Sequence, residues 1–158
     1  MITRARLYVP ALVVVIMAVF PGLAVAFPAA AAADSRTLAD QALVLVNQQR
    51  VKAGCANLHT VAQLQRPAGQ QSHDQAAQDK LGHRGTDGST SRDRLGRLGY
   101  SQWAENVAQF PNPQQAVHFW STSRAHRASM LNCAFTDTGL AVARSLSGRL
   151  YWTQTFGG

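Results

Sequence analysis

The sequence predicts an α+β domain in which helices flank a small antiparallel sheet. Apolar residues recur at three- and four-residue steps after Ser35 and again after Pro113, as expected of helices with one buried face. Residues 139–156 instead have the pattern of two strands that meet at a Ser147-Gly148 turn, which is typical of a hairpin. Strands and helices do not alternate regularly along the chain, so the pattern argues against a parallel βαβ fold.

The first two helices are predicted from their end signals. Asp34 or Ser35 can cap the first helix, which ends near Ala53-Gly54, where glycine suits the residue after the last turn. Residues 56–66 are predicted to be a loop. Residues 67–81 are predicted to form a second, weaker helix, because proline favours the first helical position.

The later elements are predicted from turn and capping signals of the same kind. Asn112-Pro113 is a strong helix start, since the asparagine side chain can accept a hydrogen bond from the first turn. The predicted elements are a loop over 82–91, a short helix capped by Thr90 or Ser91 and stopped by Gly99, a strand over 103–110, a helix from 113 whose buried face runs to Ser123, a helical turn over 126–131, and strands over 139–144 and 150–156.

The N-terminal segment has the pattern of a secretory signal peptide. Arg4 and Arg6 precede an almost entirely apolar run over residues 7–20. Small residues follow, with Ala-x-Ala cleavage patterns at 24–26 and 31–33. This order of a positive start, an apolar stretch and small residues directs a protein to export.

The predicted cleavage point sets the boundary of the domain. We predict a signal peptide over residues 1–33, cut after Ala33, with Ala26 as the second choice, and a single domain over 34–158. The alternative is an uncleaved N-terminal anchor, because residues 7–27 approach the roughly 20 apolar residues that span a bilayer. The protein is accordingly predicted to be secreted or associated with the cell envelope.

Composition and charge narrow the class of partner. The chain is 46% hydrophobic and 15% charged, as expected of a globular domain. The formal charge of +7 falls to +5 when the leader, which holds two arginines and no acidic residue, is removed. The remaining arginines are spread out, apart from Arg92, Arg94 and Arg97, and no array of aromatic residues accompanies them. This pattern argues against nucleic acid and favours anionic envelope polymers or lipid head groups.

Two cysteines, Cys55 and Cys133, are the complete set. In an oxidising compartment they predict one disulfide, with a single way to pair. Two free or metal-binding thiols are the alternative.

Three polar residues are candidates for chemistry: His83, Glu105 and His126. His83 lies in a glycine-rich loop that lets its side chain project, Glu105 is the only glutamate of the chain, and His126 begins a helical turn. Two imidazoles and one carboxylate can hold a divalent cation, typically zinc, or act as a general acid and base. The remaining histidines favour surface or structural roles: His59, His73 and His118.

Six short segments occur in the order found in one known family. They are Asn47-Gln48-Gln49-Arg50 with Ala53-Gly54-Cys55, Gly82-His83-x-Gly85-x-Asp87-Gly88-Ser89, Arg94-x-x-x-Leu98-Gly99-Tyr100, Ala104-Glu105-Asn106-Val107-Ala108, Trp120-x-x-Ser123-x-x-His126-Arg127-x-x-Met130-Leu131, and Gly139-Leu140-Ala141-Val142 with Tyr151-Trp152-Thr153-Gln154-x-Phe156-Gly157. Together they span about residues 43–157. On these segments the chain resembles the short bacterial members of the CAP superfamily, the cysteine-rich secretory, antigen 5 and pathogenesis-related-1 proteins.

The resemblance implies a three-layer α-β-α sandwich with a central cleft. In the family, two histidines and two glutamates of this cleft can bind a divalent metal. His83, His126 and Glu105 match three of these positions, whereas the second glutamate falls on Ser123 and the motif glycine on Ala104. Ser123 is three residues before His126, a spacing that favours a helix cap, with a Ser–His nucleophile pair as the alternative.

The resemblance implies several functions and no shared reaction. Our first hypothesis is a binding module for a lipid, a sterol or a cell-envelope component. The second is a metal-assisted hydrolase, in which His83 and His126 hold zinc or another divalent cation and Glu105 is the catalytic base. The third is a secreted structural or host-interaction protein, with a host factor as partner and no catalysis. The aromatic residues that either add ligand surface or simply fill the core are Trp103, Phe110, Phe119, Trp120 and Tyr151.

Overall fold

The computed structural model describes residues 27–158, so residues 1–26 of the leader predicted over residues 1–33 lie outside the described part of the chain. Five helices and four strands follow one another in these residues. They are α1 (Phe27–Lys52), β1 (His59–Thr60), α2 (Ala62–Gln78), α3 (Ser91–Leu95), β2 (Trp103–Gln109), α4 (Pro113–Thr122), α5 (Arg124–Met130), β3 (Asp137–Arg144) and β4 (Leu150–Gly157).

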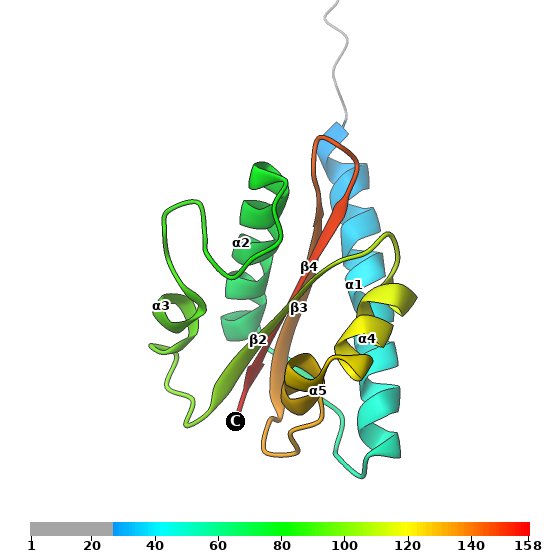
Figure 1. The fold of residues 1–158 in the computed structure, drawn as a ribbon, viewed down its shortest axis with the longest axis vertical. Helices are drawn as coiled ribbons and strands as arrows, with labels where there is room; N and C mark the ends of the chain where they lie inside the picture. The colour runs from blue at the N-terminus through cyan, green and yellow to red at the C-terminus, as the bar shows by residue number, and fades with distance from the viewer. Residues whose placement is uncertain (1–26) are drawn as a thin grey trace, which may run out of the picture.

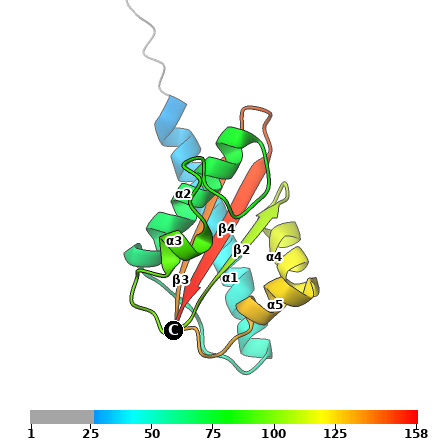
Figure 2. The same cartoon turned by 60° about the vertical axis from the view of Figure 1, so that its left-hand side comes forward.

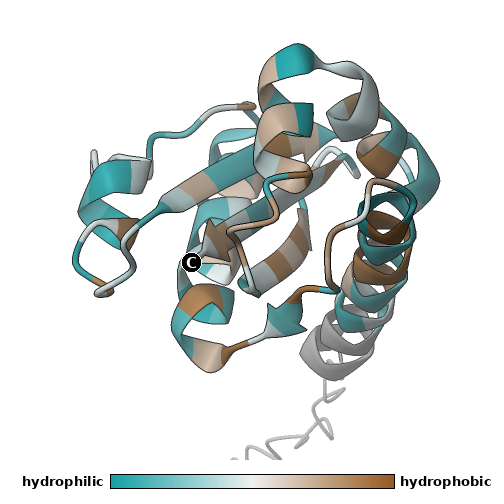
Figure 3. Ribbon diagram, turned by 90° about the horizontal axis from the view of Figure 1, so that it is seen from below, coloured by the Kyte–Doolittle hydropathy of each residue, from teal (hydrophilic) through white to brown (hydrophobic). Residues whose placement is uncertain are grey.

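The elements form three layers, with a four-stranded sheet between two layers of helices (Figure 1). Helices α1, α4 and α5 lie on one side of the strands, and α2 and α3 lie on the other (Figures 1 and 2). Seen from below, the strands occupy the middle of the molecule (Figure 3). The predicted α+β class and the α-β-α sandwich are therefore confirmed.

The sheet has the strand order β1-β3-β4-β2. Strand β4 pairs antiparallel with both β3 and β2, as the predicted hairpin requires. The short β1 pairs parallel with the start of β3, so the sheet is mixed rather than purely antiparallel. The sequence did not indicate β1 because two residues between a loop and a helix carry no periodicity.

Helix α1 begins earlier than predicted. It starts at Phe27, so Asp34 and Ser35 lie inside the helix and do not cap it. The reason is the alanine run before Asp34, since alanine has the highest helix propensity and continues the helix toward the leader. The predicted cleavage after Ala33 stays a prediction.

Helix α2 also begins before its predicted start. Its first residue is Ala62, and Pro67 lies inside the helix rather than at its first position. The predicted loop over 56–66 is therefore wrong, because its second half is helical. Backbone pairing of β1 with β3 continues through Val61, whose N–H donates to Thr138, and this contact starts the helix. The helix ends at Gln78 rather than near Leu81, because the next residue adopts a left-handed conformation.

The two faces of the sheet have different cores. The face toward α1 and α4 is apolar, with Trp120, Trp152 and Phe156 fully buried. The face toward α2 contains buried polar contacts, for example Gln75 Nε2 to Thr153 Oγ1 at 3.0 Å. A helix that packs through such residues lacks a strong apolar period, which explains the weak helical signal of α2.

Glycine at position 139 sets how closely α2 approaches β3. A Cβ atom on Gly139 would lie 2.3 Å from the backbone carbonyl carbon and oxygen of Leu64. No side chain fits at this distance. Gly139 therefore permits the contact of α2 with the sheet, and this contact positions the loop that follows α2.

Local features of the remaining elements follow the predictions closely. Cys55 and Cys133 form the predicted disulfide. Asn112 caps α4 through its side chain, which accepts from the Gln115 N–H, and Thr90 caps α3 in a reciprocal pair with Asp93. The short helix ends at Leu95 rather than at Gly99.

Candidate functional site

The three predicted site residues come from three segments around strand β2. His83 lies in the loop after α2, Glu105 lies in β2, and His126 lies in α5. The Nδ1 atom of His83 is 2.9 Å from Oε1 of Glu105. His83 is also close enough to His126 for its charge to lower the pKa of His126. The fold thus places His83 on Glu105 and brings His126 within electrostatic range.

Glu105 is held by an arginine that the sequence analysis did not single out. Its side chain is 1% exposed, and Arg94 Nη2 donates to both carboxylate oxygens, at 3.0 and 2.9 Å. The Arg94 side chain is itself only 4% exposed. A buried carboxylate needs a charged partner of this kind. Two features of the sequence could have indicated this pair. Glu105 is the single glutamate, and Arg94 is the first residue of one of the six segments that resemble the CAP family.

Arg94 also fixes the loop that presents His83. Its Nη2 atom donates to the His83 carbonyl at 3.0 Å, and its Nη1 atom donates to the Ser89 carbonyl at 3.2 Å. On the other side of the loop, Gln71 Nε2 donates to the Gly82 carbonyl at 2.7 Å. The backbone of His83 is therefore fastened on both sides. Its side chain remains half exposed, and Nδ1 is committed to Glu105.

His126 is oriented by a serine and by its own backbone. Its Nδ1 atom is 2.8 Å from Ser123 Oγ, and Asn106 Nδ2 donates to the His126 carbonyl at 2.9 Å. Ser123 stands at the N-terminal cap position of α5, as predicted, but its side chain makes no capping hydrogen bond and contacts the imidazole instead. The Ser123 hydroxyl thus orients the His126 ring.

The donor set that faces a cation here is incomplete. With both Nδ1 atoms engaged, each imidazole has only Nε2 left for an outside partner, an arrangement that metal-binding histidines share. Catalytic zinc sites, however, supply three protein ligands, and the Glu105 carboxylate is already bound to Arg94. No group of three or more His, Cys, Asp or Glu residues able to hold a metal occurs within residues 27–158. These residues do not fit a tightly held cation.

The aromatic candidates divide into core and site. Trp120 and Tyr151 are fully buried and belong to the core. Phe119 is half-buried beside His126, with ring centroids 5.0 Å apart, and Phe110 lies 5.3 Å from Phe119. The Phe110–Phe119–His126 row therefore joins an apolar surface to the imidazole of His126.

The titration of His126 provides a test of this geometry. Desolvation by burial lowers its pKa, and the nearby His83 lowers it further. We expect the His126 ring to titrate below its usual value of about 6.5, and His83→Ala to raise that pKa. The ring resonances of His126 in an NMR titration measure both effects. An unchanged titration in His83→Ala would contradict the proximity of the two rings.

The same shift has a consequence for stability. A folded His126 with a lowered pKa stays neutral where the unfolded chain already binds a proton. Its contribution to stability is therefore complete above the unfolded pKa of about 6.5 and is lost as the pH falls through the folded value. His126→Gln should reduce the loss of stability on acidification to pH 5, as measured by urea unfolding at both pH values.

The fold and the site define a class of protein. A mixed sheet between two helix layers, with His83 on a buried Glu105 at one sheet edge and His126 nearby, is the arrangement expected of a CAP domain. Comparison with known families agrees, because residues 43–156 match the CAP, or Cysteine-rich secretory protein, family. The chain belongs to this family.

Individual relatives support the same assignment. The chain is 32% identical over 119 residues to the uncharacterized membrane protein YlbC of Bacillus subtilis, covering 73% of this chain and 33% of that protein. It therefore spans about a third of that relative's length. An extracellular protein of Bacillus anthracis with an SCP domain is 26% identical, with a TM-score of 0.69, covering 78% of this chain and 41% of that one.

A more distant relative shares the fold alone. An outer surface protein of Borrelia burgdorferi has a TM-score of 0.67 at 16% identity, covering 75% of this chain and 90% of that chain. Within residues 27–158, no helix has both the length and the apolar character needed to cross a membrane.

Proposed function

We propose that this protein is an exported binding module whose ligand, a lipid or another cell-envelope component, contacts the free edges of His83 and His126. The observation that carries the proposal is the state of Glu105. Its carboxylate is buried and bonded to Arg94 and His83, so it serves to orient an imidazole. A site that presents two oriented imidazoles and no free carboxylate is suited to binding.

The chemistry around the imidazoles favours an amphipathic ligand. The Nε2 atoms can donate to or accept from a polar head group. The Phe110–Phe119–His126 row offers apolar surface next to it, with all three residues partly exposed. A ligand with a polar head and an apolar body satisfies both surfaces at once, which favours a lipid over a purely polar polymer.

Export is part of the proposal. It rests on the leader pattern of residues 1–33 and on the B. anthracis relative, which is described as extracellular. The B. subtilis relative is described as a membrane protein, which is compatible with a domain held at the envelope. The disulfide is also typical of proteins outside the cytosol.

The alternative of a metal-assisted hydrolase is less well supported. It requires Glu105 to take a proton from a bound water. Both oxygens of Glu105 already accept hydrogen bonds from Arg94, and one of them also contacts His83. In this geometry Glu105 is a positioning residue.

Lipid retention by the full chain tests the proposed function. The protein is incubated with a total envelope lipid extract, repurified, and its bound lipid is measured by mass spectrometry. We expect the wild type to retain lipid and His83→Ala/His126→Ala to retain on the order of tenfold less, because both polar contacts are lost. His59→Ala/His118→Ala is the matched control, since both histidines are exposed and were predicted to have no role in the site.

Two results would count against the proposal. A wild-type protein that retains no lipid would leave the structural role as the better explanation. Cleavage of an ester or peptide substrate that stops in the His83→Ala/His126→Ala variant would favour the hydrolase.

A further inference from the structure

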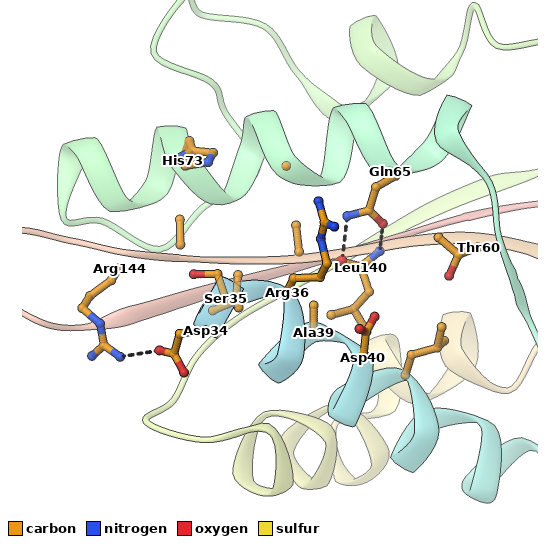
Figure 4. A pocket seen from close by; sticks show the side chains of 15 residues that line it. Asp34, Ser35, Arg36, Ala39, Asp40, Thr60, Gln65, His73, Leu140 and Arg144 are labelled. Atoms are coloured by element: carbon orange, nitrogen blue, oxygen red, sulfur yellow. Dashed lines mark hydrogen bonds and ion pairs between the residues drawn. The ribbon is translucent and has the colours of Figure 1, made fainter. Parts of the chain in front are cut away.

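A groove separate from the histidine site runs between α1 and α2. Its volume is about 660 Å³, and strand β3 forms its floor (Figure 4). Ala39 and Leu43 line the α1 wall, and Gly69 and His73 line the α2 wall. The groove lies at the β3 edge of the sheet, whereas Glu105 lies in β2 at the opposite edge.

Strand β3 is an open edge along most of its length. Its outer neighbour β1 pairs only with Asp137 and Thr138. Antiparallel pairing directs the backbone groups of alternate residues toward and away from the partner strand. Since the N–H of Ser145 bonds to Arg149 of the same hairpin, the backbone groups of Val142 and Arg144 point away from β4 and into the groove.

Leu140 is the first residue of this edge that points away from β4 beyond the pairing with β1, and a side-chain amide pairs with its backbone. Gln65 Nε2 donates to the Leu140 carbonyl at 2.9 Å, and the Leu140 N–H donates to Gln65 Oε1 at 3.0 Å (Figure 4). These two hydrogen bonds reproduce those of a neighbouring strand. The edge therefore accepts an amide group in the position that a peptide would occupy.

The next position along β3 has no such partner. Among the side chains of residues 34–158 and the described strands, none accepts from the N–H of Val142 or donates to its carbonyl. Val142 is nevertheless only 5% exposed. Backbone groups in so buried a residue are nearly always paired, and the groove is the side from which water or a ligand can reach them.

We propose that the groove binds an extended peptide segment, which adds to the sheet by hydrogen-bonding to Val142 and Arg144. Val142 and Arg144 are two residues apart on β3, which is the spacing at which an added extended strand forms its hydrogen bonds. An acyl chain could fill the same volume, but it would leave the backbone groups of Val142 buried and unpaired. The backbone chemistry of the floor thus selects a peptide.

The walls determine which peptide fits. Alternate side chains of a bound strand point to opposite walls. Those toward α1 meet Ala39 and Leu43, so small apolar residues fit there. Those toward α2 meet Gly69, where the absence of a side chain leaves open space, and polar His73. The rim carries charges of both signs, namely Asp34, Arg36, Asp40 and Arg144, so the peptide needs no net charge.

Gly69 offers a clean way to block the groove. A Cβ atom added there would have no neighbour within 4 Å, so a large side chain extends into the groove without a clash at its base. The position lies inside α2, where replacing glycine also favours the helix. Gly69→Phe should therefore fold and fill the groove, and Gly69→Ala should fold and leave it open.

Peptides are selected for binding to the full chain from a phage-displayed library of random dodecapeptides. The selected peptides are then synthesised, and their binding is measured by calorimetry. We expect Gly69→Phe to weaken binding on the order of tenfold or more, with Gly69→Ala unchanged. N-methylation of alternate peptide amides should weaken binding by a similar factor, because it removes strand pairing. Bound peptide should also slow hydrogen exchange at the amides of Val142 and Arg144.

Other outcomes would overturn the inference. One is a selection that yields no binding peptide. Another is a set of peptides that bind equally well to Gly69→Phe and in N-methylated form. A third is binding of laurate that Gly69→Phe abolishes when no peptide binds, which would make the groove an acyl site. None of these depends on His83 or His126, so the result is independent of the proposed lipid site.

Discussion

Replacing Arg94 with methionine should destabilise the fold by about 3 kcal/mol, since removing one partner of a buried ion pair leaves an uncompensated charge. Glu105 is 1% exposed and would keep only the His83 contact. The hydrogen bonds from Arg94 to the carbonyls of His83 and Ser89 would be lost as well. Urea unfolding monitored by tryptophan fluorescence measures the change.

A double-mutant cycle separates the charge effect from the loss of packing. Arg94→Met/Glu105→Gln removes both charges at once, so the double variant should recover part of the stability lost in Arg94→Met. A surface change on another helix, Arg66→Met, serves as control, because Arg66 is exposed and no ion pair involves it among the described residues. If the single and double variants are equally unstable, the carboxylate is not the source of the loss.

The same variant bears on function. If Glu105 and Arg94 only position His83, Arg94→Met should retain less lipid, because the His83 loop moves. If Glu105 is instead a catalytic base, its carboxylate is needed to take up a proton. Glu105→Gln distinguishes the two. Its amide oxygen can still accept from His83 and keep the ring oriented. Lipid retained per folded molecule should therefore survive, although the unpaired Arg94 lowers stability, whereas any hydrolysis that needs a carboxylate base should not survive.

The sequence predicted best those features that depend on neighbouring residues. The caps at Asn112 and Thr90 form as predicted, because a side chain within three residues decides them. The β3–β4 hairpin also forms as predicted, since its strands and turn are contiguous. The pairing of Cys55 with Cys133 followed from there being only two cysteines.

Features that depend on distant contacts were not predictable in the same way. The start of α2 is set by pairing of β1 with β3, and no local signal marks it. The burial of α2 against a polar layer hides the usual apolar period. Of the candidate site, His83, Glu105 and His126 were found by type and motif, but Arg94 was not, because its role depends on a carboxylate 11 positions away. A buried glutamate needs a positively charged partner, and the single glutamate was therefore the available sign that an arginine or lysine lies beside it.

Arg50 holds together the end of the molecule that contains the disulfide. Its side chain is fully buried, no carboxylate among the described residues forms an ion pair with it, and burial lowers its pKa. The guanidinium instead donates to backbone carbonyls at 2.8 to 3.0 Å, which are those of Ala56, Met130, Asn132 and Phe135. Arg50 thus fastens the end of α1 to the chain between α5 and β3.

Arg50→Met keeps the length of the stem and removes every donor. We expect a loss of about 4 kcal/mol, because each of the four carbonyls left without a donor costs on the order of 1 kcal/mol. Arg50→Lys should fall between the two, since an ammonium group cannot reproduce the planar fork that reaches carbonyls on both sides. Urea unfolding under oxidising conditions, with the disulfide intact, measures all three proteins.

The ordering of the three proteins decides the interpretation. If charge alone mattered, the free energy of unfolding of Arg50→Lys would equal that of the wild type. If packing alone mattered, that of Arg50→Met would equal the wild-type value. Only a requirement for several directed donors places lysine between them. A loss below about 1 kcal/mol in Arg50→Met would mean that water replaces the guanidinium at these carbonyls, and that the disulfide holds this end of the domain without it.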